Sequence, residues 1–166
     1  ITTIEHLAFT GSEKLESIVI PPKVVEIADH TFYGCFALSS VSLPDGLTKI
    51  GDLAFSQCSL STIKLPDSLT FIGTRAFDFN EKLASIEIPD SVTHLGNFAF
   101  TDCYMLHSVK LPTGITSIPD EAFRACWNLK NLVVPEGVTE VGRLSFGDCQ
   151  SLRSLTLPNS LRKIGE

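Results

Sequence analysis

The sequence lacks the features that mark several large classes of protein. Its longest uninterrupted apolar runs are only a few residues, such as 18–20, far below the ~18 needed to cross a bilayer. Basic residues are outnumbered by acidic ones, 13 to 19, which gives a net charge of −6. This balance argues against a nucleic-acid binder and, more weakly, against docking on anionic lipid. Apolar residues still make up 43%, enough to build a core and to exclude bulk disorder.

Motifs for catalysis and for metal or nucleotide binding are also missing. The sequence contains no G-x-S-x-G, no G-x-G-x-x-G, no phosphate-binding loop and no C-x-x-C. Histidines are few and scattered over unrelated positions of the repeat described below, so they form no cluster: His6, His30, His94 and His107. We therefore expect a non-catalytic protein without a cofactor or a bound metal.

What the chain does contain is one pattern with a period of 22 or 23 residues. Its consensus is L-x-x-I-x-L-P-x-x-V-x-x-I-G-x-x-A-F-x-x-C-x-x. Prolines keep this interval at positions 21, 44, 66, 89, 112, 135 and 158, and phenylalanines keep it at positions 9, 32, 55, 77, 100, 123 and 146. We expect a single domain over 1–166 with a partial repeat at 1–14, repeats one to six at 15–37, 38–59, 60–82, 83–105, 106–128 and 129–151, and a partial repeat at 152–166.

The pattern inside a repeat predicts its geometry. Apolar residues two apart, such as Ile18 and Ile20, point to one face of a short strand, and the proline that follows ends the strand. A second stretch with inward residues three apart comes next, then a glycine that relieves a turn, and then A-F-x-x-C, which is typical of about one helical turn. We expect parallel strands centred on 18–20, 41–43, 63–65, 86–88, 109–111, 132–134 and 155–157. Five buried phenylalanines are expected to stack: Phe32, Phe55, Phe77, Phe100 and Phe123.

The repeat closely resembles the BspA-like, or Treponema-type, leucine-rich repeat. Residues 38–44 (LSSVSLP) and 50–58 (IGDLAFSQC) reproduce its signature almost verbatim. The departures are few: Asn80 replaces Cys, Ala28 and Pro119 replace Gly, Thr31 and Ser145 replace Ala, and repeat two lacks one residue between Cys58 and Leu60. The resemblance implies a right-handed leucine-rich-repeat solenoid, a horseshoe or curved rod. A parallel β-sheet would line one face, and short helical or 3₁₀ turns would line the other. It also implies a surface or secreted protein that adheres to host or matrix proteins.

The five cysteines share one position of the repeat: Cys35, Cys58, Cys103, Cys126 and Cys149. Asn80 and Ser12 occupy the same position in other repeats, so we expect a small inward side chain that bonds to loop carbonyls. Disulfides between neighbouring repeats are the alternative, since stacked coils lie ~5 Å apart. Parallel side-chain directions and the odd number of cysteines argue against this alternative.

Candidate partner-binding residues lie at the variable positions. Tyr104 and Trp127 share the position after Cys in adjacent repeats, with Phe36 in the same position of repeat one, and Met105 follows Tyr104. Tyr and Trp are enriched at binding hot spots, although partial burial against the next repeat would explain the aromatics equally well. Basic residues on or beside the outer sheet face join them: His107, Lys110, Lys130 and Arg153. Small hydroxyl residues flank the inward Ile and predict a flat polar strip.

Two functions remain open from the sequence. The first is an interaction or adhesion module that binds a protein or glycan through the variable positions. The second is a structural spacer that displays another domain. The chain opens and stops within a repeat, so we expect a piece of a longer array whose exposed ends associate with each other in isolation.

Overall fold

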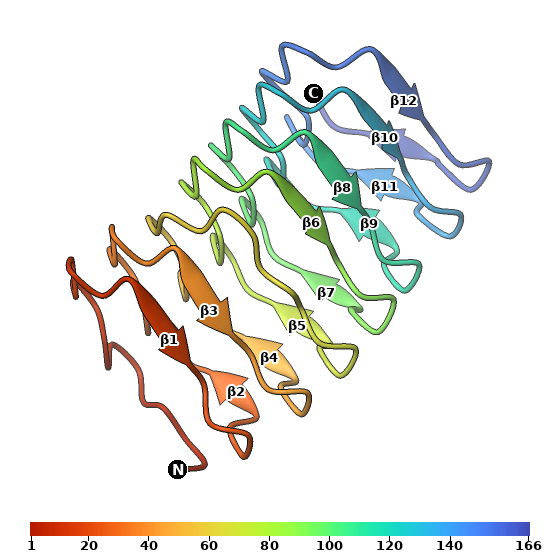
Figure 1. The fold of residues 1–166 in the computed structure, drawn as a ribbon. Helices are drawn as coiled ribbons and strands as arrows, with labels where there is room; N and C mark the ends of the chain where they lie inside the picture. Colours follow the sequence, from red (N-terminus) through yellow and green to blue (C-terminus); the bar gives the residue numbers. More distant parts are fainter.

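The computed structural model describes residues 1–166 and shows a stack of similar coils, one repeat to each coil (Figure 1). The two termini lie at opposite ends of this elongated stack. Every strand pair is parallel, as the repeat predicts. The structure holds no helix that could serve as a membrane span.

The front sheet contains the three-residue strands. These are β1 (Ser17–Val19), β3 (Ser40–Ser42), β6 (Ser85–Glu87), β8 (Ser108–Lys110), β10 (Asn131–Val133) and β12 (Ser154–Thr156). Each begins and ends one residue before the expected bounds. The front sheet consists of three paired ladders, β1–β3, β6–β8 and β10–β12.

A second row of two-residue strands lies behind the front sheet (Figure 1). It was expected only as an inward-facing stretch. One part consists of β2 (Glu26–Ile27), β4 (Lys49–Ile50), β5 (Phe71–Ile72) and β7 (His94–Leu95), and the other of β9 (Ser117–Ile118), β11 (Glu140–Val141) and β13 (Lys163–Ile164). The register joins equivalent residues of successive coils, for example Ile27 with Ile50.

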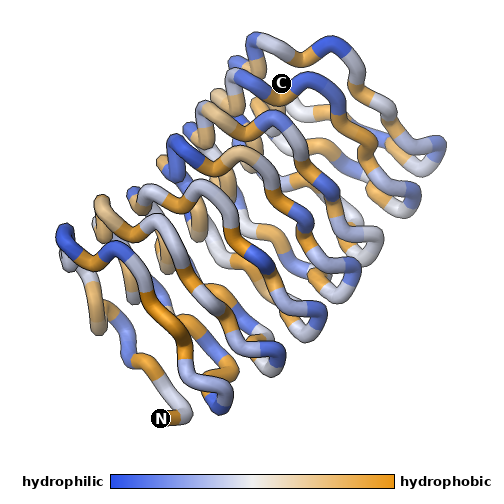
Figure 2. Tube along the Cα trace, viewed as in Figure 1, coloured by the Kyte–Doolittle hydropathy of each residue, from blue (hydrophilic) through white to orange (hydrophobic).

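The core runs along the axis of the stack, between the two rows of strands. Figure 2 shows apolar positions recurring at the same places of each coil, in line along the stack. The five expected phenylalanines are fully buried. Successive rings stack with centroids 5.2–5.5 Å apart, so the predicted phenylalanine ladder is confirmed.

The predicted helical turns on the face opposite the sheet are wrong. The A-F-x-x-C segments form successive tight turns, because the residue just before each segment and the residue before its last position take left-handed backbone, for example Leu53 (φ 53°) and Gln57 (φ 58°). An α-helix requires right-handed dihedrals at every residue. Alternate N–H groups therefore donate to the next coil, as Phe55 N–H does to the Ala76 carbonyl at 2.8 Å.

The expected strand at 63–65 is also missing. Residues 61–65 donate no backbone hydrogen bond, and the front sheet stops at β3 and resumes at β6. Residues 61–65 directly follow repeat two, and repeat two is one residue short. The shortened connection leaves these residues out of the regular register, although Ile63 and Leu65 stay buried.

A second departure from the repeat breaks the back row. The consensus glycine N–H donates to the previous coil, as from Gly96 to the Ile72 carbonyl and from Gly142 to the Ile118 carbonyl. Proline has no N–H, so Pro119 makes no such bond to Leu95. A Cβ at this position also crowds the previous coil: one added at Gly142 would lie 2.5 Å from an Asp120 oxygen. The consensus glycine is thus required for close approach rather than for a turn, and β7 and β9 separate where it is absent.

Candidate interaction surface

The predicted aromatic pair forms on one edge of the front sheet. The Tyr104 and Trp127 rings stack with centroids 4.1 Å apart and planes 22° apart, and 43% of Trp127 is exposed. Tyr104 itself is half-buried. The Asn128 amide joins the two coils beside the rings: it donates to the Tyr104 main-chain carbonyl at 2.8 Å and lies 3.7 Å from Met105 Sδ. The two stacked rings form one continuous aromatic surface on this edge, which we call the aromatic step.

The surroundings of Tyr104 and Asp102 raise the pKa of both groups. Burial and the nearby Asp102 carboxylate raise the pKa of the Tyr104 hydroxyl, and partial burial raises the pKa of Asp102. Tyr104 therefore stays neutral through physiological pH. Met105, which is 54% exposed, extends the apolar surface beside the pair.

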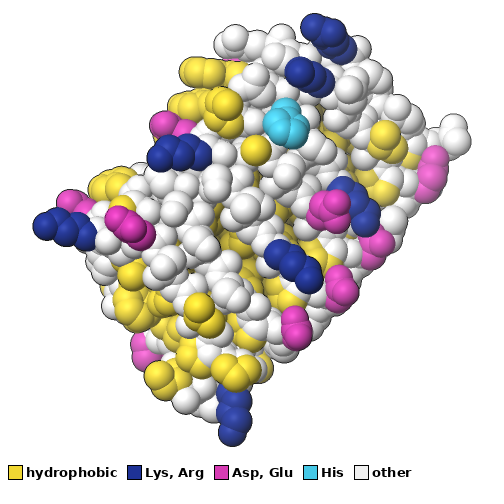
Figure 3. Space-filling view, in the orientation of Figure 1, with side chains coloured by type: hydrophobic (Ala, Val, Ile, Leu, Met, Phe, Trp, Pro, Cys, Tyr) yellow, Lys and Arg dark blue, Asp and Glu magenta, His cyan; other side chains and the backbone are white.

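Three of the four predicted basic residues line up beside this step. His107, Lys130 and Arg153 occupy one position of three successive coils, and each is exposed. The Arg153 N–H donates to the Lys130 carbonyl, which places these two coils in direct contact. Figure 3 shows histidine and basic side chains over the C-terminal coils of the front face. Only the buried leucine position and one further residue separate this basic row from the aromatic position.

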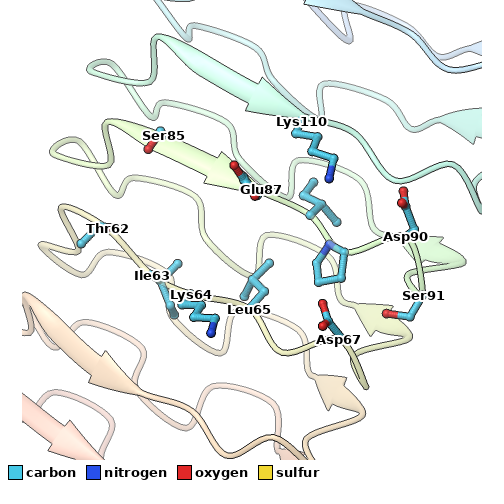
Figure 4. A pocket seen from close by; sticks show the side chains of 12 residues that line it. Thr62, Ile63, Lys64, Leu65, Asp67, Ser85, Glu87, Asp90, Ser91 and Lys110 are labelled. Carbon is cyan, nitrogen blue, oxygen red and sulfur yellow. The ribbon is translucent and has the colours of Figure 1, made fainter.

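Lys110 and Phe36 do not belong to this group. Lys110 lies on β8 and lines a groove of about 500 Å³ with Lys64 and Glu87. Figure 4 shows that the groove residues come from the 62–67 segment, from the β6 coil and from β8. Phe36 lies three coils from Tyr104, near the N-terminal end, and is 53% exposed. The structure thus brings together Tyr104, Met105, Trp127, His107, Lys130 and Arg153, which we call the edge surface.

Sequence reasoning missed three grooves, each at a departure from the repeat. The groove in Figure 4 lies beside residues 61–65, which lack strand pairing. A groove of about 320 Å³ lies between β7 and β9 at Pro119. A third, of about 400 Å³, lies at the missing residue of repeat two. The sequence signal was available, because the missing residue of repeat two directly precedes residues 61–65 and Pro119 marks the second groove.

The cysteines are free thiols with a structural role. Each Sγ donates to the carbonyl of a phenylalanine in the preceding coil at 3.1–3.3 Å, which confirms the predicted bond to main-chain carbonyls. Desolvation raises the pKa of these thiols, to about 11 at the half-buried Cys149. Thiols that stay protonated are poor nucleophiles and poor metal ligands.

Comparisons with known proteins agree with this architecture. The family model for BspA-type leucine-rich repeat regions matches residues 2–126 and 48–166, in six copies. The chain belongs to the BspA-type leucine-rich repeat family. No curated protein matches it.

Solved structures resemble the chain over nearly its whole length. A leucine-rich repeat protein from Bacteroides ovatus shares 34% identity at a TM-score of 0.95, and the match covers 98% of this chain and 43% of that one. The T. pallidum leucine-rich repeat protein shares 33% identity at a TM-score of 0.78, with 96% and 64% covered. The pneumococcal vaccine antigen PcpA, at 22% identity and a TM-score of 0.50, covering 91% and 58%, shares the fold. The chain thus spans less than two thirds of each of these proteins. Its family consists of leucine-rich repeat proteins, which generally mediate protein interactions and are usually non-catalytic.

Proposed function

We propose that this BspA-type array is a non-catalytic interaction module of a cell-surface or secreted protein, and that it binds a protein partner through the edge surface. The observation that carries the proposal is the Tyr104–Trp127 step, a stacked aromatic pair beside exposed Met105. Rigid aromatic area loses little conformational entropy on binding and is typical of hot spots. Adhesion to host or matrix proteins is the role that the family resemblance favours.

The charge pattern supports a partner with an acidic patch. The whole chain carries −6, yet His107, Lys130 and Arg153 form a basic row next to the aromatic step. None of the three makes an ion pair within the protein. A row of free basic groups beside an apolar step steers an acidic partner and speeds its association.

The experiment measures binding of the purified chain to a panel of immobilised host matrix proteins by surface plasmon resonance. For each partner that binds, the Y104A/W127A double variant should lose binding with an unchanged circular dichroism spectrum. F71A/H94A removes a stacked pair, with centroids 4.2 Å apart, from the back row and is the matched control. Retained binding of Y104A/W127A, or equal loss in the control, would refute the edge surface as the site.

A structural spacer is the second candidate. The observation that favours it is the uniform ladder of buried Phe and Cys positions, which stiffens the array without need of a ligand. A spacer predicts that no partner binds the edge surface and that substitutions there leave the activity of the complete protein unchanged.

Self-association through the ends is a further proposal. The last coil exposes apolar side chains, with Leu155 37%, Leu157 40% and Ile164 59% exposed, beside strands whose outer edges are unpaired. Light scattering over a concentration series should show association that L157K weakens. A monomer at every concentration would refute it.

A further inference from the structure

The turn after the proline of repeat two places an aspartate directly before a glycine, a pair that occurs only here in the chain. The turn follows β3 and is closed by the Leu47 N–H, which donates to the Pro44 carbonyl at 3.1 Å. Its two central residues, Asp45 and Gly46, are both exposed. A Cβ built on Gly46 would meet no atom within 4 Å, so the space around this residue is open.

The reactive groups of this pair are not engaged elsewhere. The Gly46 N–H donates to no backbone carbonyl, and the Asp45 carbonyl accepts from no backbone N–H. No ion pair includes the Asp45 carboxylate. It also differs from the aspartates whose carboxylates accept a backbone N–H of the next coil, which are Asp29, Asp52, Asp90 and Asp120.

A peptide group without hydrogen bonds can rotate while the turn stays in place. The nitrogen after an aspartate reaches the side-chain carboxyl carbon only when the bond between Cα and the carbonyl carbon rotates. In a turn, that rotation interconverts type I and type II, and type II needs left-handed backbone at the second central residue. Glycine adopts this backbone without steric cost. The turn at 45–46 can therefore pass through the ring-closing geometry without unfolding.

The equivalent turns of the other repeats lack this combination. In three of them a serine stands at the position of Gly46, and its hydroxyl donates to a carbonyl of the preceding coil at 2.6–2.8 Å: Ser68, Ser91 and Ser160. In two others the glycine is kept, but a threonine or a glutamate precedes it. Neither of these side chains closes a five-membered ring on the next nitrogen. The turn at 45–46 is thus the one with a free aspartate, a free amide and no tie to its neighbour.

We propose that Asp45 and Gly46 form a site of self-modification, at which the aspartate becomes isoaspartate. The Gly46 nitrogen attacks Cγ of the protonated Asp45 carboxyl. The N–Cγ bond forms, and the carboxyl hydroxyl leaves with the amide proton as water, which gives a succinimide. Water then adds to the Asp45 main-chain carbonyl carbon and breaks its bond to the Gly46 nitrogen. The chain now runs through Cγ, and water is the only co-reactant.

The product changes the surface on which it forms. The main chain of the turn becomes longer by one carbon, and the free carboxylate is attached directly to the α-carbon. Asp45 lines a groove of about 330 Å³ together with Lys64, which belongs to the segment without strand pairing between β3 and β6. The modification therefore alters the shape and the charge of this part of the front sheet. The inference does not depend on the proposed function.

The test follows the native chain over several weeks at physiological temperature and neutral pH. Peptide mapping with electron-transfer fragmentation distinguishes isoaspartate from aspartate at each position, and a succinimide is recognised by the loss of one water. Isoaspartate should accumulate at Asp45 and stay at background at Asp67 and Asp90. The rate at Asp45 should rise at mildly acidic pH, because the protonated carboxyl is the form that reacts and an aspartate is mostly ionised at neutral pH.

Two reciprocal variants test the structural argument, with circular dichroism to show that each stays folded. G46S supplies the hydroxyl tie of the other turns, so it should slow the reaction at Asp45 by about tenfold, because one hydrogen bond must break first. S68G removes that tie from the next turn, so it should raise the rate at Asp67 toward that of Asp45. D45E should abolish the product at this position.

Three results would overturn the proposal. The first is isoaspartate that forms at Asp45 in the urea-unfolded chain but not in the native chain. The second is a rate at Asp45 that G46S leaves unchanged. The third is a rate at Asp67 that stays at background in S68G.

Discussion

Because repeat two is one residue short, the Leu60 N–H donates to Asn80 Oδ1, whereas the equivalent leucines of other repeats donate to the carbonyl three residues earlier. This difference leads to a quantitative prediction. Asn80 is fully buried and makes three hydrogen bonds: it accepts from Leu60 N–H at 3.1 Å and donates to the Phe55 and Phe77 carbonyls at 2.7 and 3.0 Å. N80C restores the family consensus. The thiol can still donate to Phe55, as its counterparts in other coils do, but it leaves the Leu60 N–H without a partner. A buried donor without a partner costs about 1–3 kcal/mol.

The predicted cost should depend on the length of repeat two. With one alanine inserted between Ser59 and Leu60, the Leu60 N–H can bond to the Cys58 carbonyl, as its equivalents do in other repeats. N80C should then cost less than about 0.5 kcal/mol, which gives a coupling energy of about 1–2 kcal/mol in a double-mutant cycle. Urea unfolding followed by circular dichroism measures all four proteins.

Hydrogen exchange and a matched control complete this test. Exchange of the Leu60 amide should speed up in N80C and recover in the double variant. The control is C103N, because Leu83 N–H, the counterpart of Leu60 N–H for a side chain at position 103, already bonds to the Asn80 carbonyl at 3.0 Å; this change should gain nothing from the insertion. An equal cost of N80C in both backgrounds would refute the compensation.

The remaining predictions concern packing, ionisation, thiol chemistry and the back row. F77A should lower the unfolding free energy by about 3–5 kcal/mol; a cost below about 1 kcal/mol would contradict its buried place in the ladder. Burial raises the pKa of the Asp78 carboxyl, so the folded state holds this proton more tightly and stability falls as pH rises above the unfolded pKa. D78N should remove this pH dependence of the unfolding free energy. Urea unfolding from acid to neutral pH measures it, and an unchanged pH dependence in D78N would contradict the prediction. In the native protein the thiols should react slowly with a disulfide reagent, and Cys149 should react first. After denaturation all five thiols should react. Faster reaction of a more deeply buried cysteine than of Cys149 would contradict the prediction. P119G supplies the missing N–H, so the new glycine amide should show slow hydrogen exchange; rapid exchange would show that another cause separates β7 from β9.

Much of the fold could be predicted from the sequence because the same residue pattern recurs seven times along the chain. A single apolar period is ambiguous, but seven aligned prolines and phenylalanines require equivalent residues to stack. The phenylalanine ladder and the cysteine-to-carbonyl bonds follow from that stacking. The exact bounds of the strands could not be predicted, because the repeat fixes which residues face inward and not where hydrogen bonding begins.

Of the candidate site, the aromatic pair and most of the basic row could be predicted from shared repeat positions. Shared position means adjacency in a solenoid, so Tyr104 and Trp127 had to meet. Lys110 and Phe36 separated from the group for the same reason: one lies on the strand instead of the edge, and the other lies three coils away.

Tertiary structure alone decided what the departures from the repeat do. The sequence shows that repeat two is short, that Asn80 replaces Cys and that Pro119 replaces Gly. It does not show that the first two compensate one another, since their contact is a hydrogen bond between coils. Nor does it show that A-F-x-x-C forms turns rather than a helix. That choice depends on whether each N–H bonds within its own coil or to the next one, and only stacking supplies the second acceptor.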